Sequence, residues 1–140
     1  MCIGNREGGD DAVGPYIADK LKDSDIDVID CGTNPENYTS IVKQKKPENL
    51  FIIDAADIGI QPGKIRIIPK EKIGVMHIST HGIPVPVLMN YLEQYVENVV
   101  LIGIQPKTMS GQMSDPIIKS ANKLVEIIKN KEFDKIKILI

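Results

Sequence analysis

The sequence predicts an α/β fold of three layers, in which a mostly parallel, twisted sheet has helices on both faces. Short apolar runs of strand length alternate with longer segments whose apolar residues recur at helical spacing. Residues 50–54 and 98–104 are apolar almost without interruption, which is typical of strands covered on both faces. Alternating strands and helices indicate parallel strands joined by right-handed helical crossovers. At 140 residues, the chain is expected to form one domain, residues 1–140.

Local signals support each element in turn. In the first helix, Pro15 lies near the start, where its missing N–H does no harm. The second helix begins with Asn34, a capping residue, followed by a proline and an acid. The last helix has Ser114 or Asp115 as its cap and Pro116 behind it. The predicted strands are residues 1–4, 26–31, 50–54, 64–68, 98–104 and an edge strand at 136–140, and the predicted helices are 13–21, 34–44, 87–95 and 117–128.

Composition argues against several classes of function. A formal net charge of −2 gives no basic field to attract nucleic acid or anionic lipid. No apolar run approaches the ~20 residues that cross a bilayer, and the first residues do not resemble a signal peptide. Cys2 and Cys31 are too few for a disulfide scaffold, so we expect them to be buried and reduced. These features predict a cytoplasmic protein, by default a monomer, that binds neither nucleic acid nor membrane.

Three polar clusters follow predicted strands or precede helices. The first joins the first strand to the first helix and contains Asp10 and Asp11. The second begins with Asp54, the last residue of a buried strand, and the third surrounds His81. In parallel sheets, ligands bind beyond the carboxyl ends of the strands. These three clusters could therefore converge at one edge of the sheet.

Each of these residues also has a simpler explanation. Asp10 and Asp11 could cap the first helix, whose N-terminus attracts carboxylates, and Asp57 could stabilise a turn. A single histidine in a Gly/Pro loop, such as His81, could be polar surface. Asp54 is harder to explain in this way, because a charge at the rim of a sheet, where water is partly excluded, needs a partner.

Taken together, two carboxylates and an imidazole suit a divalent cation of intermediate softness, such as nickel, zinc, manganese or cadmium. Three protein ligands leave positions open for water or a substrate group. A metal held in this way can polarise a carbonyl group and acidify a bound water. Without metal, paired carboxylates could share a proton and act as acid and base. The residues alone leave both mechanisms open.

The glycine-rich stretch before the first helix invites comparison with phosphate-binding loops. The spacing of Gly4, Gly8 and Gly9 is not that of G-x-G-x-x-G, and the G-x-x-x-x-G-K-[ST] motif is missing from the chain. The Asp10–Asp11 pair would repel a phosphate at the helix start. A nucleotide-binding enzyme is therefore a minor alternative.

Several short pieces occur in order from the start of the chain to about residue 130. They are Gly4-Asn5, Asp10-Asp11, Gly14-Pro15, Asp30-Cys31-Gly32-Thr33, Ile53-Asp54-Ala55, Ser79-Thr80-His81 and Gly103-Ile104-Gln105-Pro106. This ordered set resembles the hydrogenase maturation endopeptidases. The last piece and residues 62–68 are most similar to the branch that acts on formate-hydrogenlyase-type or methanogen-type hydrogenases.

The resemblance implies a specific activity. The family has a single α/β domain and removes a short C-terminal extension from the large-subunit precursor of nickel–iron hydrogenases, after nickel insertion. Its metal-contacting residues correspond here to Asp11, Asp54 and His81, where Asp11 matches the second acid of the pair. The family is classed with aspartic-type endopeptidases, which makes Asp11 and Asp54 the candidate catalytic residues.

The resemblance also implies a role for nickel. The precursor would carry the metal, which would serve as a recognition mark that insertion is complete. Another divalent cation could occupy the same site in the free enzyme. The alternative is a non-catalytic nickel-sensing or chaperone-like binding module for hydrogenase assembly, with the same site and no peptidase activity.

Overall fold

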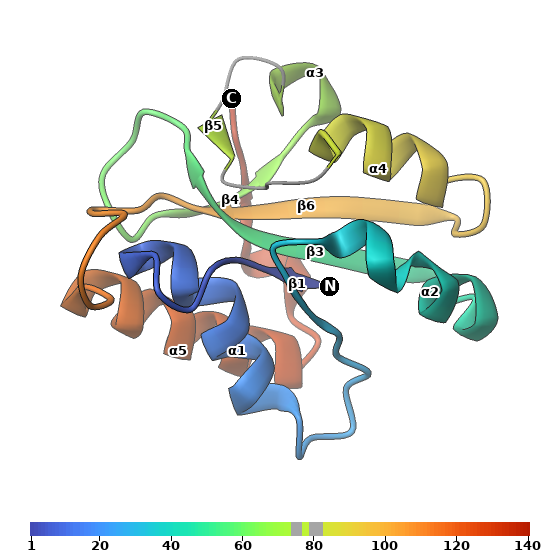
Figure 1. Cartoon of the computed structure of the whole chain (residues 1–140), viewed down its shortest axis with the longest axis horizontal. Coiled ribbons are helices and arrows are strands. Elements are labelled where there is room, and N and C mark those ends of the chain that lie inside the picture. Colours follow the sequence, from blue (N-terminus) through green and yellow to red (C-terminus); the bar gives the residue numbers. More distant parts are fainter. Residues whose placement is uncertain (74–76, 79–82) are drawn as a thin grey trace.

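The protein is built around a central sheet, described here from a computed structural model that covers residues 1–73, 77–78 and 83–140. Within these residues the strand order is β2-β1-β3-β6-β4-β7, and β5 pairs with β3 outside this path (Figure 1). Strands β2, β1, β3 and β6 are parallel, whereas β4 is antiparallel to β6 and β7 is parallel to β4. The strands are β1 (Cys2–Ile3), β2 (Asp30–Gly32), β3 (Asn49–Asp57), β4 (Ile65–Ile68), β5 (His77–Ile78), β6 (Asn98–Ile104) and β7 (Lys137–Ile138).

Helices cover both faces of this sheet. Helices α1 and α5 lie on one face, and α2, α3 and α4 lie on the other (Figure 1), which confirms the predicted α/β class. No helix in the described part of the chain has the length and hydropathy to span a membrane. The helices are α1 (Val13–Leu21), α2 (Thr39–Lys45), α3 (Lys70–Ile73), α4 (Val85–Leu92) and α5 (Asp115–Lys129), with 3-10 turns η1 (Gly9–Ala12), η2 (Pro35–Tyr38) and η3 (Phe133–Lys135).

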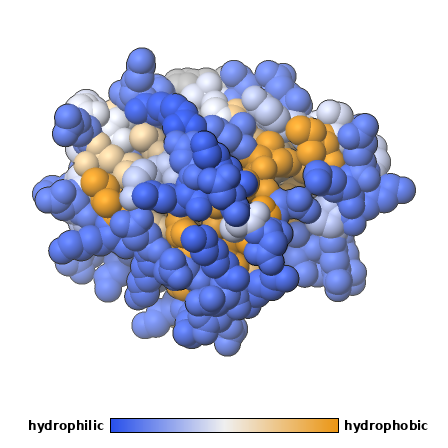
Figure 2. Space-filling view, turned by 90° about the horizontal axis from the view of Figure 1, so that it is seen from below, coloured by the Kyte–Doolittle hydropathy of each residue, from blue (hydrophilic) through white to orange (hydrophobic). Residues whose placement is uncertain are grey.

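Apolar side chains of the central strands are buried on both sides of the sheet. In β3, Ile53 and Ala55 pack in the core that includes α1 and α5, whereas Ile52 and Ala56 pack in the core that includes α4. This alternation is that of a strand whose successive side chains point to opposite faces. It explains why residues 50–53 of β3 and 99–104 of β6 are apolar almost without interruption. The outer surface on the side of α1 and α5 is mostly hydrophilic, with apolar atoms visible in patches (Figure 2).

Two strands differ in length from the prediction because of their partners. Strand β3 continues past Asp54 to Asp57, since β5 pairs in antiparallel fashion with Ala56 and Asp57. The predicted strand at 26–31 is reduced to Asp30–Gly32, because β1 offers only Cys2 and Ile3 as pairing partners. Both cysteines are buried and free, as expected.

The predicted helix at 34–44 divides into η2 and α2, and the side chain of Asn34 makes no capping hydrogen bond. The helix predicted at 87–95 runs instead over Val85–Leu92. The C-terminal tail contributes β7 at the edge of the sheet, as predicted. Strand β6 occupies residues 98–104, the bounds expected from its apolar run.

Helix α1 approaches strand β1 closely at Gly14. A Cβ atom at this position would lie 2.2 Å from the carbonyl oxygen of Ile3 and 2.8 Å from its backbone carbon and nitrogen. Only glycine leaves room for the strand backbone here. This contact holds the start of α1, and with it the preceding turn η1, against the end of β1.

We expect Gly14→Ala to destabilise the protein. Alanine normally stabilises a helix interior by ~1 kcal/mol relative to glycine, but here its methyl group would overlap the backbone of β1, and overpacking costs about 1–3 kcal/mol. Urea denaturation should show a lower free energy of unfolding. Lys123→Ala, at an exposed position of α5, is the control and should change stability by less than ~0.5 kcal/mol. A more stable Gly14→Ala variant would show that the close approach is not as described.

Candidate active site

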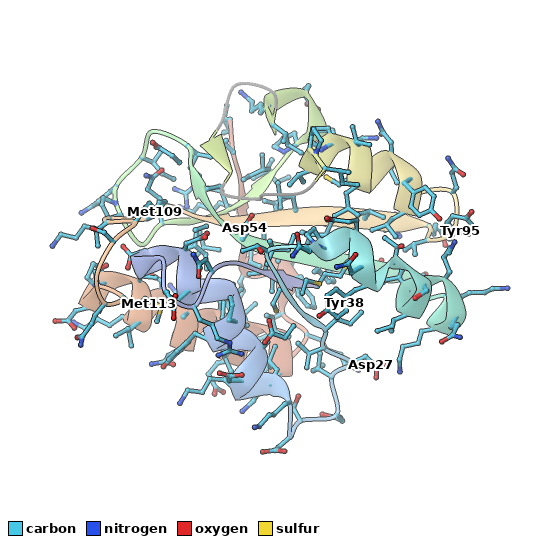
Figure 3. All side chains as sticks on the ribbon, in the orientation of Figure 1. Asp27, Tyr38, Asp54, Tyr95, Met109 and Met113 are labelled. Carbon is cyan, nitrogen blue, oxygen red and sulfur yellow. The ribbon has the colours of Figure 1, made fainter. Side chains whose placement is uncertain are left out.

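Asp54 is a buried carboxylate in the middle of the sheet. It lies on β3, pairs in register with Gly103 of β6, and is located near the centre of the molecule (Figure 3). Its exposed fraction is 0%, and neither carboxylate oxygen has a hydrogen-bond partner among the described residues. Burial of an ionised group without a partner is costly, so this position requires an explanation other than packing.

The environment of Asp54 favours its protonated form. The pKa of Asp54 lies well above its usual range. The larger cause is burial, and the smaller is the negative charge of Asp11. A contact with the backbone N–H of Ala55, which falls short of hydrogen-bond geometry, acts in the opposite direction. Both dominant causes disfavour a negative charge at this point.

Asp11 is the second member of the pair. It lies in η1, is 3% exposed, and its Oδ2 accepts a hydrogen bond of 3.1 Å from the backbone N–H of Asn5. The start of α1 has no side-chain capping hydrogen bond, so Asp11 does not cap that helix. Turn η1, which carries Asp11, contacts β3, and the charge of Asp11 contributes to the raised pKa of Asp54. The fold therefore brings these two carboxylates, which are remote in sequence, to the same part of the molecule.

Asp10 has a different environment from its neighbour. Its Oδ2 accepts hydrogen bonds from the backbone N–H groups of Lys107 (2.7 Å) and Thr108 (2.9 Å), and its Oδ1 accepts one from that of Ser114 (2.7 Å). Burial raises the pKa of Asp10, but these bonds from Ser114, Thr108 and Lys107 outweigh it, so that the pKa lies below its usual value. The prediction that Asp10 caps its own helix was wrong, because its partners lie in the segment before α5.

Asp57 and Gln105 join the ends of β3 and β6. Asp57 accepts from the backbone N–H of Gly59 (3.3 Å), which confirms its predicted turn role, and from Nε2 of Gln105 (3.2 Å). Oε1 of Gln105 accepts from the backbone N–H groups of Ile58 (2.7 Å) and Ile60 (3.4 Å). The sequence analysis did not predict a role for the Gln105 side chain, although a polar residue directly after an apolar strand is a signal for a role at the strand end.

The third predicted ligand, His81, lies outside the described residues. The described part of the chain contains no group of three or more His, Cys, Asp or Glu side chains that could hold a metal ion. Within that part, the site therefore consists of the Asp11–Asp54 pair. Carboxylate oxygens are suitable ligands for a divalent cation, and the buried oxygens of Asp54 fit this use, since no described group donates a hydrogen bond to them.

Comparison with known proteins connects this chain to a family. Residues 13–131 match the family model of the hydrogenase maturation protease. The chain is 38% identical over 110 residues to the hydrogenase 3 maturation protease of Escherichia coli. This alignment covers 76% of the chain and 70% of the relative. It is 33% identical over 141 residues to a putative hydrogenase maturation protease of Methanocaldococcus jannaschii, with 91% of this chain and 83% of the relative covered.

Solved structures agree with these matches. The solution structure of the endopeptidase HycI from Escherichia coli superposes with a TM-score of 0.90 at 32% identity, covering 99% of this chain and 94% of the other. The structural match therefore extends over nearly the whole chain, as does the sequence match to the protein of Methanocaldococcus jannaschii. The chain belongs to the hydrogenase maturation protease family, whose members are endopeptidases that process hydrogenases.

Proposed function

We propose that this member of the family removes the C-terminal extension from the large-subunit precursor of a nickel–iron hydrogenase, and that it recognises the nickel already inserted there. The observation that supports this most is the buried carboxylate of Asp54, which lies beside Asp11 and has no hydrogen-bond partner among the described residues. Two carboxylates at close range repel each other, and a cation between them relieves the repulsion.

In this proposal Asp11, Asp54 and His81 contact the nickel that the precursor brings. His81 follows β5 by three residues, and Ile78 of β5 pairs with Ala56, two residues beyond Asp54. Two carboxylates and an imidazole suit nickel. Since these are only three protein ligands, the metal keeps positions for the groups of the precursor that already hold it.

Hydrolysis also needs a group that accepts a proton from water. As the water oxygen bonds to the carbonyl carbon of the scissile peptide, its proton moves to a base and is later delivered to the departing amine as the C–N bond breaks. A base works best when its pKa lies near the working pH. The raised pKa of Asp54 makes it our preferred general base, and Asp11 raises that pKa through its charge.

We further propose that the reaction takes place in the cytoplasm. The support is that Cys2 and Cys31 are both free thiols, as is usual in a reducing compartment. Nickel insertion into the precursor would then precede trimming in the same compartment.

Replacement of the proposed base should abolish cleavage. With nickel-loaded precursor as substrate, we expect Asp54→Asn to cut at least about a hundredfold more slowly than wild type, because a general base contributes about 10²–10⁴-fold. The mobility shift of the trimmed subunit on gels measures the rate. Asp134→Asn, an exposed carboxylate in η3, is the matched control and should cut normally. Full activity of a folded Asp54→Asn variant would refute the assigned site.

Recognition of nickel can be tested separately from cleavage. We expect precursor without nickel to remain uncut, and the same precursor to be cut after nickel is loaded into it. Wild-type enzyme that is incubated with nickel and then desalted should still fail to cut the nickel-free precursor, because the metal marks the substrate. Equal cleavage of both precursors would contradict the role of nickel as a mark. Binding of the nickel-loaded precursor without cleavage would instead indicate the non-catalytic alternative.

A further inference from the structure

A cavity of about 260 Å³ lies at the carboxyl ends of β3 and β6. Ala55 and Asp57 of β3 form one side, and the segment 105–109 that follows β6 forms the other. Ala55 directly follows Asp54 in the strand, so the cavity and the proposed base are at the same end of β3, with the side chains of Ala55 and Asp54 on opposite faces of the strand. The side chain of Met109 is 43% exposed and lies at the end of β6 (Figure 3).

Residues 107–109 of this wall are held by the turn that carries Asp11. Asp10 accepts the hydrogen bonds of Lys107 and Thr108, and its backbone N–H donates to the carbonyl oxygen of Thr108 at 2.8 Å. Asp10 also holds the far end of the same loop, through the backbone N–H and the hydroxyl of Ser114 (2.7 and 2.9 Å). One buried carboxylate therefore fixes both ends of the segment 107–114.

The backbone of the turn also touches this loop. Gly9 has φ +62°, and a Cβ there would lie 2.6 Å from the backbone nitrogen of Ser110 and 2.8 Å from its carbonyl oxygen. Only a residue without a side chain fits both the left-handed conformation and the narrow gap. Residues 9–11 thus form one connection between the cavity wall and the carboxylate pair.

The chemistry of the clamp requires a carboxylate. All partners of the Asp10 carboxylate in this loop are backbone N–H groups or the hydroxyl of Ser114, and an ionised carboxylate is an acceptor on both oxygens. An asparagine could satisfy one side of the loop, but its NH₂ group would face N–H donors on the other side. Removing an acceptor from buried donors is costly.

We propose that this cavity binds the precursor chain beside the scissile bond, and that Asp10 is the positioning residue that holds the cavity wall in place. This inference rests on the proposed function. The volume is below the ~300 Å³ at which pockets for drug-sized ligands begin and suits one side chain of a peptide. Ala55, Pro106 and Met109 offer it apolar contact. The side-chain amide of Gln105 is already engaged at both its oxygen and its nitrogen.

The test is steady-state cleavage of nickel-loaded precursor at varied precursor concentration. We expect Asp10→Asn to raise KM roughly tenfold while kcat changes by less than about threefold, which is the pattern of lost substrate binding. Met109→Ala, at an exposed position that the core does not need, should also raise KM at nearly constant kcat. Asp134→Asn is the control and should keep both constants.

Other outcomes would overturn the inference. If Asp10 served folding alone, Asp10→Asn would lower the active fraction, and thus apparent kcat, without changing KM. If Asp10→Asn does not fold, Met109→Ala and the larger Met109→Trp still decide, since unchanged KM in both would show that the cavity is not used. An inactive Asp54→Asn together with unchanged KM in the Asp10 and Met109 variants would contradict this inference and leave the proposed function standing. A wild-type enzyme that does not cut the nickel-loaded precursor would contradict both the proposed function and this inference.

Discussion

The site depends on two carboxylates that are held close together where little water reaches. Asp54 is fully buried, Asp11 almost so, and the charge of Asp11 adds to the effect of burial on Asp54. The fold tolerates this arrangement because β3 is paired on both sides, with β1 and with β6, and lies between two apolar cores. Burial and the charge of Asp11 both act against ionisation of Asp54, and this cost is retained in the folded protein.

Hydrogen-bond donors decide what each carboxylate does. Asp10 and Asp11 are adjacent in sequence and both buried, yet Asp10 is surrounded by N–H groups that hold its pKa low. Asp54 has no donor among the described residues, and its pKa is raised. Asp57, three residues further along the same strand, is exposed and stabilises a turn. Residue type and burial alone would not separate a clamp from a candidate catalytic group.

The sequence predicted the features that depend on local pattern. The apolar run of β6 defined its bounds, and the aspartate at the end of the apolar run in β3 proved to be a fully buried carboxylate. Features set by distant partners could not be predicted. The segment that Asp10 holds lies about a hundred residues away, and the extension of β3 depends on β5. His81 lies outside the described residues, so its place beside the pair stays a prediction.

The most direct test of the account is a measurement of the ionisation of Asp54 itself. A carbon-13 NMR titration of its carboxyl group, assigned through the Asp54→Asn variant, should give a pKa well above the usual ~3.9 in metal-free protein. In Asp11→Asn the pKa of Asp54 should be lower than in wild type, because one cause of its increase is the charge of Asp11, and burial should still keep it above the usual value. An ordinary pKa for Asp54, or one that Asp11→Asn does not change, would contradict the claim that these two carboxylates form one site.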